Sequence, residues 1–231
     1  MPELQTARFC DTHIYETGYF ELLDPAEREL IENQSRVLTY RKGETLIKQG
    51  TFASTIFYLE AGLVKVFLEG NSKNLILNIT PPDSLLGLQA VFEGNNTYPY
   101  SVSCYSETVV KTVDIAVFKQ LLGQNAGFAN RIINNLNEST AQTYGRFYSL
   151  TRKQLHGRLA DILLCLSNRI FKSDTFNLPL TRSDLGELTS MATESVIRLL
   201  KEFHDDELIS ITSKTIHLTD IPRLQRISEL G

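Results

Sequence analysis

The sequence contains few cysteines and no long apolar run. Its three cysteines, Cys10, Cys104 and Cys165, are too few and too widely spaced for a disulfide framework, and their odd number favours a reducing compartment. The longest apolar runs, such as 162–166, are far shorter than the roughly 18 residues that a bilayer span requires. The first residues also lack the basic and apolar regions of a signal peptide. We therefore expect a cytoplasmic protein that has no membrane partner.

Proline and glycine are also sparse, with 7 and 13 residues among 231, which excludes a collagen-like or low-complexity chain. Hydrophobic residues make up 42% and charged residues 22%, so the chain can bury a core. Its length exceeds one average domain of roughly 100–150 residues and suggests two. The net charge is −4, and the acidic excess lies within residues 1–151. Residues 152–231 are therefore the better candidate to contact a polyanion.

Residues 37–118 contain short β-rich runs that are separated by turn signals at roughly 8–12-residue spacing. Apolar residues alternate locally, as in 56–59 and 63–67. This pattern predicts an antiparallel β-barrel or jelly roll.

Residues 126–150 change to a helical periodicity. Apolar or small side chains recur at steps of three or four: Phe128, Ile132, Leu136, Thr140, Thr143, Phe147 and Leu150. The stripe predicts one long helix that pairs with the same helix of a second copy in a parallel dimer. The alternative is a core helix that packs within the chain. A second helix is predicted from Arg158 to Phe171.

Two helices joined by a short turn are predicted next. Thr181 and Asp184 form a variant of the capping box, so a helix is expected to start there. Gly186 is small enough for another helix to cross closely, and residues 190–193 break the first helix. The second helix has an apolar side made of Val196, Leu199, Leu200 and Phe203.

A wing is predicted after these helices, from two short β runs at 208–211 and 215–218. A helix-turn-helix followed by a wing indicates duplex DNA, because the second helix fits the roughly 12 Å major groove while the wing contacts phosphates. Residues on or near the outer side of that helix are Glu194, Ser195, Ile197, Arg198 and Lys201. The alternative is a helical hairpin without a ligand.

Residues 181–200, the wing, the long helix and the glycine-punctuated roll together resemble the CRP/FNR family (cyclic-AMP receptor protein/fumarate-nitrate regulator) of bacterial transcription factors, over about residues 30–222. The resemblance implies an α+β fold with a double-stranded β-helix (jelly roll, residues 1–125), a dimerisation helix (126–151) and a winged helix-turn-helix (152–231). It also implies a homodimer that binds a palindromic DNA operator, with RNA polymerase as a candidate partner.

The resemblance also assigns DNA-contacting residues. The family reads bases with a Glu followed four residues later by an Arg, and Glu194 and Arg198 stand there. An Arg can donate to guanine O6 and N7, and a carboxylate can accept from a cytosine or adenine amine. Thr193 replaces an Arg of the cyclic-AMP receptor branch, which favours a T-T-G-A type of half-site. Residues expected near phosphates are Arg182, Ser183, Ser195, Thr212 and Lys214. The alternative for Glu194 and Arg198 is a solvated ion pair.

The roll lacks the groups with which the family holds cyclic AMP. Leu88 replaces the expected Glu, and no Arg occurs from Lys42 to Asn130, so the roll has no planar fork for a phosphate. Because the lysines of the roll can bind a phosphate as point charges, the sequence does not exclude other nucleotides as ligands. We expect an unidentified small-molecule effector in a more apolar pocket, whose candidate residues are Leu88, Tyr98, Tyr100, Ser101, Thr143 and Tyr144. Ordinary packing is the alternative for the tyrosines.

Other sensors and function classes fit the sequence poorly. An iron–sulfur cluster needs four thiolates, and the chain has three cysteines. The β-rich residues 37–118 contain no His for haem, so the candidate haem ligands are His13 and Cys10. Nothing near Cys10 or Cys104 marks a lowered thiol pKa. We predict no catalytic residues, no metal and no resident cofactor. A cupin-like enzyme is opposed by the same lack of His, and a cyclic-nucleotide-binding module with a non-DNA partner is opposed by the winged motif.

Overall fold

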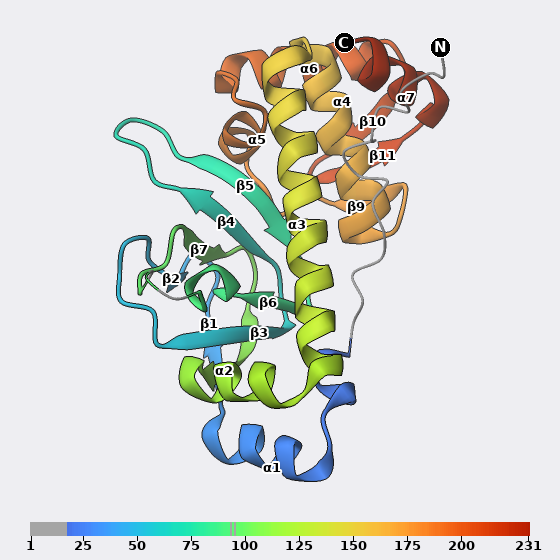
Figure 1. The fold of residues 1–231 in the computed structure, drawn as a ribbon. Helices are drawn as coiled ribbons and strands as arrows, with labels where there is room; N and C mark the ends of the chain where they lie inside the picture. The colour runs from blue at the N-terminus through green and yellow to red at the C-terminus, as the bar shows by residue number, and fades with distance from the viewer. Residues whose placement is uncertain (1–17, 93, 95) are drawn as a thin grey trace. The chain divides into compact units, whose positions relative to one another are not determined.

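The computed structural model describes residues 18–92, 94 and 96–231, which fall into two units (Figure 1). One unit ends at Glu138 and the other begins at Ser139. The division therefore falls inside one 27-residue helix, α3 (Ala126–Arg152), whereas the sequence predicts boundaries at both ends of this helix. Among the described residues, no helix combines the length and the apolar character needed to cross a membrane.

The first unit is built on two four-stranded antiparallel sheets. The first sheet has the order β1 (Arg36–Tyr40), β8 (Thr108–Asp114), β3 (Thr55–Ala61) and β6 (Ser84–Leu86). The second has the order β2 (Thr45–Ile47), β7 (Ser101–Cys104), β4 (Val64–Leu68) and β5 (Leu75–Thr80). Together with the C-terminal helices, these sheets confirm the predicted fold class.

Strand β3 is buried on both faces, because successive side chains of a strand point to opposite sides. Phe57 and Leu59 lie in the core between the two sheets, together with Val64 of β4 and Val102 of β7. Ile56 points the other way, into a cluster formed with helices. The first sheet is thus covered by the second sheet on one face and by helices on the other.

The helices of this cluster are α1 (Pro25–Gln34), α2 (Ile115–Gln124) and the first turns of α3, with the short 3₁₀ helices η1 (Tyr19–Leu22) and η2 (Leu88–Ala90). Neither α1 nor α2 is predicted from the sequence. Phe128 and Ile132, which the sequence assigns to the dimer stripe of α3, are buried in this cluster. For the first half of that stripe, packing within the chain is therefore the correct interpretation.

The second unit contains the C-terminal half of α3 and a winged helical module. Its further elements are α4 (Leu155–Cys165), a π-helical segment (Leu166–Phe171), β9 (Thr175–Asn177), α5 (Arg182–Thr189), α6 (Thr193–Asp205), β10 (Ile209–Thr212), β11 (Thr215–Leu218) and α7 (Ile221–Leu230). The sheet has the order β10, β11, β9, so β9 adds a third strand to the predicted hairpin. The predicted helix 158–171 starts three residues earlier and changes to π-helical geometry after Cys165.

Gly62 marks a point where the roll tolerates no side chain. Its φ is +98°, and a Cβ atom there would lie 2.5 Å from the carbonyl oxygen of Glu107. Gly43 has a similar φ of +87°, but a Cβ atom there would meet nothing within 4 Å. Substitutions at the two positions therefore distinguish the cost of backbone strain, which arises at both, from the cost of steric overlap, which arises only at Gly62.

We expect Gly43→Ala to lower the free energy of unfolding by about 1–2 kcal/mol through backbone strain alone. Gly62→Ala should cost at least about 1 kcal/mol more, because Glu107 and Thr108 at the start of β8 must also move. Urea denaturation of the two variants measures both values. Equal losses would contradict the overlap at Gly62.

Candidate nucleic-acid interface

The start of α5 is fixed by the predicted capping box. The Thr181 hydroxyl accepts from the Asp184 amide at 3.1 Å, and the Asp184 carboxylate accepts from the Thr181 amide at 2.8 Å. Two amides that would otherwise lack helical partners are satisfied in this way. Arg182 and Ser183 follow in the first turn, where Ser183 is exposed and Arg182 is half-buried. Burial lowers the pKa of the Arg182 guanidinium.

The turn between α5 and α6 depends on two small residues. Ser190 has a left-handed backbone with φ 54°, a conformation that glycine adopts most readily. In this turn a serine therefore adopts the left-handed backbone conformation. At Gly186 a Cβ atom would lie 2.9 Å from the Met191 carbonyl oxygen, so the close approach there is made by the backbone of the turn and not by a crossing helix.

Helix α6 separates its side chains sharply into two faces. Val196, Leu199, Leu200 and Phe203 are buried, as predicted from the spacing. The opposite side, called here the outer face of α6, consists of Thr193, Glu194, Ile197, Arg198 and Lys201. All five are exposed except Thr193, which is half-exposed, as is Ser195 beside them.

The charged groups of the outer face are open to an external partner. Glu194 and Arg198 stand one helical turn apart, and within the described residues no hydrogen bond or ion pair joins them. The N-cap residue of α6 is Ala192, which provides no side-chain hydrogen bond to the first amides of the helix. A carboxylate, a guanidinium and a helix N-terminus are thus presented on one side, where an anionic polymer can meet them.

The wing lies after α6 and is formed by β10 and β11. Its tip holds Thr212, Ser213 and Lys214, all exposed, and Ser213 has φ 58°. The Lys214 carbonyl accepts from the Leu178 amide at 2.9 Å, which fixes the backbone while the side chain stays in solvent. Lys214 is therefore held on a rigid turn.

Two arginines contact the C-terminal end of α5. Arg146 of α3 donates to the Leu188 carbonyl, and Arg158 of α4 donates to the Thr189 carbonyl at 3.5 Å. Cations are favoured at this end of a helix, because its last carbonyls carry the negative end of the helix dipole. Burial lowers the pKa of Arg146 to about 10. These contacts hold α5, and with it the turn to α6, on α3 and α4.

The carboxylate of Asp161 joins three helices. It lies on α4 and accepts from Ser149 of α3 at 2.6 Å, from Lys153 at 2.8 Å and from Ser228 of α7. Neither Arg146 nor Asp161 is identified from the sequence. The available signal is the polar spacing of Arg146 and Ser149 on one side of α3, continued by Lys153 directly after the helix, at steps of three and four.

The expected effector residues are distributed over separate environments. Tyr98 and Tyr100 are buried in the core between the sheets, while Leu88 lies in the helix cluster. The Tyr98 hydroxyl donates to the Thr55 carbonyl at 2.6 Å. The Tyr100 hydroxyl donates to Gln89 at 2.7 Å, and burial raises its pKa to about 12. Both hydroxyls are thus occupied within the roll.

The hydroxyl of Ser101 also has internal partners. It accepts from the Gln49 amide at 2.8 Å and donates to the Glu69 carboxylate at 2.5 Å. Glu69 in turn pairs with Lys48 at 2.6 Å, and hydrogen bonds from Lys48 and Ser101 hold the pKa of Glu69 below its usual value. An anionic carboxylate therefore stands at this serine.

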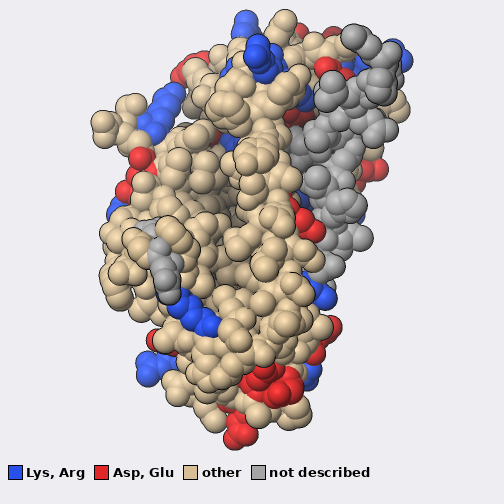
Figure 2. Space-filling view, in the orientation of Figure 1, with Lys and Arg blue, Asp and Glu red and all other residues tan. Residues whose placement is uncertain are grey.

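The remaining expected effector residues, Thr143 and Tyr144, lie on α3 in the second unit, and both are exposed. On α3 the exposed apolar side chains are Ile133, Tyr144, Phe147 and Tyr148. Figure 2 shows mainly uncharged side chains along the side of α3 that faces the viewer.

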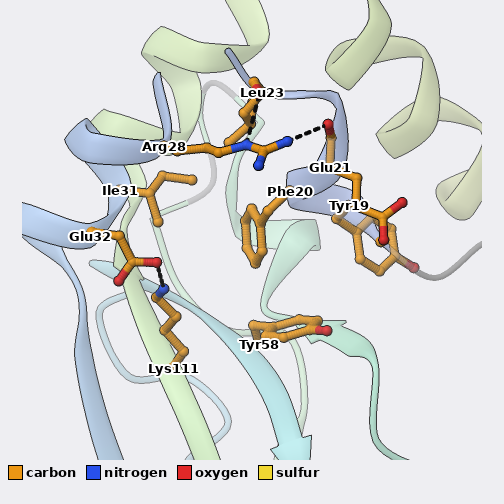
Figure 3. A pocket seen from close by; sticks show the side chains of 10 residues that line it. Tyr19, Phe20, Glu21, Leu23, Arg28, Ile31, Glu32, Tyr58 and Lys111 are labelled. Atoms are coloured by element: carbon orange, nitrogen blue, oxygen red, sulfur yellow. Dashed lines mark hydrogen bonds and ion pairs between the residues drawn. The ribbon is translucent and has the colours of Figure 1, made fainter. Parts of the chain in front are cut away.

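A cavity of about 350 Å³ lies elsewhere in the first unit, between η1, α1, β3 and β8. In Figure 3, Phe20 stands over Tyr58, and Lys111 pairs with Glu32 at the side. Arg28 is held by the carbonyls of Leu23 and Glu21, at 2.9 and 2.8 Å. None of the expected effector residues lines this cavity.

The structure tests the cysteine and histidine sensors only in part. Cys10 and His13 lie outside the described residues. Cys104 is buried, and burial raises the pKa of its thiol, which lowers its reactivity. Among the residues that the structure describes, no group of three or more His, Cys, Asp or Glu side chains is arranged to hold a metal ion.

Comparison with known proteins identifies both parts of the chain. Residues 157–227 match the family model of the Crp-like helix-turn-helix domain, and residues 37–125 match that of the cyclic nucleotide-binding domain. Transcriptional activator protein Anr of Pseudomonas aeruginosa is 25% identical over 185 residues, which cover 78% of this chain and 75% of the relative. The cAMP-activated global transcriptional regulator CRP of Salmonella typhimurium is 27% identical over 181 residues, which cover 77% and 86%.

Solved structures show the same fold. FixK2 from Bradyrhizobium japonicum aligns with a TM-score of 0.77 at 20% identity, over 85% of this chain and 98% of that structure. The two relatives are transcription regulators. The comparisons therefore do not support the alternatives of a cupin-like enzyme or of a cyclic-nucleotide-binding module with a non-DNA partner.

The network around Asp161 gives a direct test of how α3 is joined to the winged module. Asp161→Asn leaves the largely buried Lys153 without its anion, so we expect a loss of about 3–5 kcal/mol in the free energy of unfolding. The control is Glu202→Gln, which changes the exposed contact with His156 in the same unit and should cost less than about 1 kcal/mol. Urea denaturation measures both, and similar losses would argue against a structural role of Asp161.

Proposed function

Because the chain belongs to the CRP/FNR family of bacterial transcription regulators, we propose that it binds a palindromic operator as a homodimer and places one α6 in each of two successive major grooves. It is a DNA-binding transcription regulator with a cyclic-nucleotide-binding-like domain. The proposal rests on one observation above all: Glu194 and Arg198 are exposed on a helix whose opposite face is buried. As a DNA-binding regulator it acts in the cytoplasm.

Base reading is assigned to the outer face of α6. Arg198 donates two hydrogen bonds to guanine O6 and N7, and Glu194 accepts from the exocyclic amine of cytosine or adenine. Thr193, at the start of the helix, contacts a neighbouring base. The combination favours a T-T-G-A type of half-site, with half-sites about 34 Å apart.

Contacts to the DNA backbone are assigned to residues around this helix. Arg182 and Ser183 begin α5, Ser195 lies in the first turn of α6, and Thr212 and Lys214 form the tip of the wing. Because they are exposed or half-exposed and lie on rigid turns or helix starts, they position the module on phosphates without reading sequence.

Dimerisation is assigned to the exposed side of α3. Ile133, Tyr144 and Phe147 stand at heptad-compatible spacing, in register with Asn137 and Thr140. Burying this stripe against a second copy removes large aromatic side chains from water. A symmetric pair of α3 helices also gives two α6 helices the two-fold relation that a palindrome requires.

The effector is proposed to be a small molecule other than cyclic AMP, which is the effector named for the CRP relatives. Ser101 donates to Glu69, whose negative charge opposes a phosphate at this position. An effector near the predicted pocket residues must also compete with the hydrogen bonds of Tyr98 and Tyr100. RNA polymerase is the proposed protein partner on the promoter.

Arg198→Ala tests base reading. We expect a loss of about 1–3 kcal/mol in operator binding and a relaxed preference at one G·C pair of each half-site. Lys214→Ala is the matched control, since it should weaken binding to all duplexes equally and reduce the salt slope by about 0.9 for each phosphate that the lysine neutralises. Fluorescence anisotropy on matched and scrambled duplexes measures both. Equal weakening of both duplexes by Arg198→Ala would refute its role.

Phe147→Glu tests the dimer. Two like charges at the symmetric contact should raise the dimer dissociation constant at least about a hundredfold. Phe52→Glu is the control, because Phe52 is exposed to a similar degree, 72% against 69% for Phe147, but lies on the roll. Sedimentation equilibrium measures both. A wild-type monomer, or a dimer that Phe147→Glu leaves intact, would contradict the assignment of α3.

A further inference from the structure

Ile197 is the one apolar side chain of the outer face of α6, and it is 53% exposed. The other large apolar residues of this helix are almost fully buried against the unit. Within residues 153–231, the only other large hydrophobic side chain that is exposed is Leu230, near the end of α7. Ile197 therefore contributes little to the core of the winged module.

Exposure of a single apolar residue is common on protein surfaces and has no meaning by itself. The position of Ile197 is what makes it informative. At 3.6 residues per turn, it stands about 60° around the helix from Glu194, and about 40° from Thr193. The outer face spans an arc of about 140°, in the order Thr193, Ile197, Lys201, Glu194 and Arg198. A duplex that contacts Glu194 and Thr193 must also meet Ile197.

Within the major groove, an aliphatic side chain can favour one base in particular. Thymine carries a C5-methyl group on the floor of the groove, whereas the edges of guanine and adenine, the cytosine amine and the phosphates are polar. Contact of an isoleucine with these polar groups removes them from water without a hydrogen bond in return, which does not favour binding. Contact with the methyl group removes apolar surface from water, which favours binding. A burial of about 0.8 kcal/mol per methyl group corresponds to about a fourfold change in affinity.

We infer that Ile197 is a specificity-determining residue that contacts the C5-methyl group of a thymine in each half-site. The inference rests on the proposed DNA-binding function and adds a determinant that hydrogen-bonding residues do not supply. It assigns a T·A pair to the Ile197 side of Glu194, away from the pair that Arg198 reads.

The experiment uses the full-length protein and the operator that the wild type selects from a randomised duplex library. Each thymine of the half-site is replaced in turn by uracil, which keeps the base pairing and removes only the methyl group. Binding is measured for the wild type, for Ile197→Ala and Ile197→Ser, and for Leu230→Ala. The last variant removes a similar side chain that is 81% exposed and lies away from α6.

The wild type and Leu230→Ala should bind about fourfold more weakly when one particular thymine of a half-site is replaced by uracil. The two Ile197 variants should bind the thymine and uracil duplexes equally, with unchanged thermal stability. The inference is overturned if the selected half-site has no thymine, if the wild type ignores the methyl group, or if the Ile197 variants keep the discrimination. Selection of no specific duplex at all would instead refute the proposed function.

Discussion

The structure of the DNA-binding module depends on the burial of one face of α6. A 13-residue helix without a side-chain N-cap gains little stability from its own hydrogen bonds, so its apolar face must pack to hold it in place. Val196, Leu199, Leu200 and Phe203 provide that packing. The same packing fixes the rotation of the helix. The outer face is consequently presented in one orientation, which is what discrimination between base pairs requires.

Buried polar groups then join this helix to the rest of its unit. Arg146 and Arg158 hold the last carbonyls of α5, directly before the turn to α6, while Asp161 of α4 accepts from Ser149 of α3, Lys153 and Ser228 of α7. Such groups are costly unless all partners are present, so they favour one arrangement of the helices. Because Arg146 lies on the proposed dimer helix, a change in the proposed pairing of α3 would act on the position of α5.

Features encoded in short windows could be predicted from the sequence. Capping of α5 at Thr181, the two faces of α6 and the turn-punctuated strands of the roll follow from local spacing and turn chemistry. The stripe of α3 could be predicted only in part. Its periodicity indicates an apolar face but does not identify the surface that covers this face, and Phe128 and Ile132 pack within the chain. Tyr98 and Tyr100 raise the same difficulty, because a tyrosine serves equally in a core and in a pocket. The contacts of Arg146 and Asp161 join residues that are distant in sequence, and no single window contains them.

In the proposed complex, Arg198 of each of two α6 helices reads a guanine in the major groove. Methylation protection by dimethyl sulfate tests it most directly, because this reagent attacks guanine N7 in the major groove. We predict that the wild type protects a guanine N7 in each half-site, one helical turn apart on the same side of the duplex, and that Arg198→Ala leaves both unprotected. A bound protein that protects no guanine N7, or the same protection by Arg198→Ala, would contradict the account.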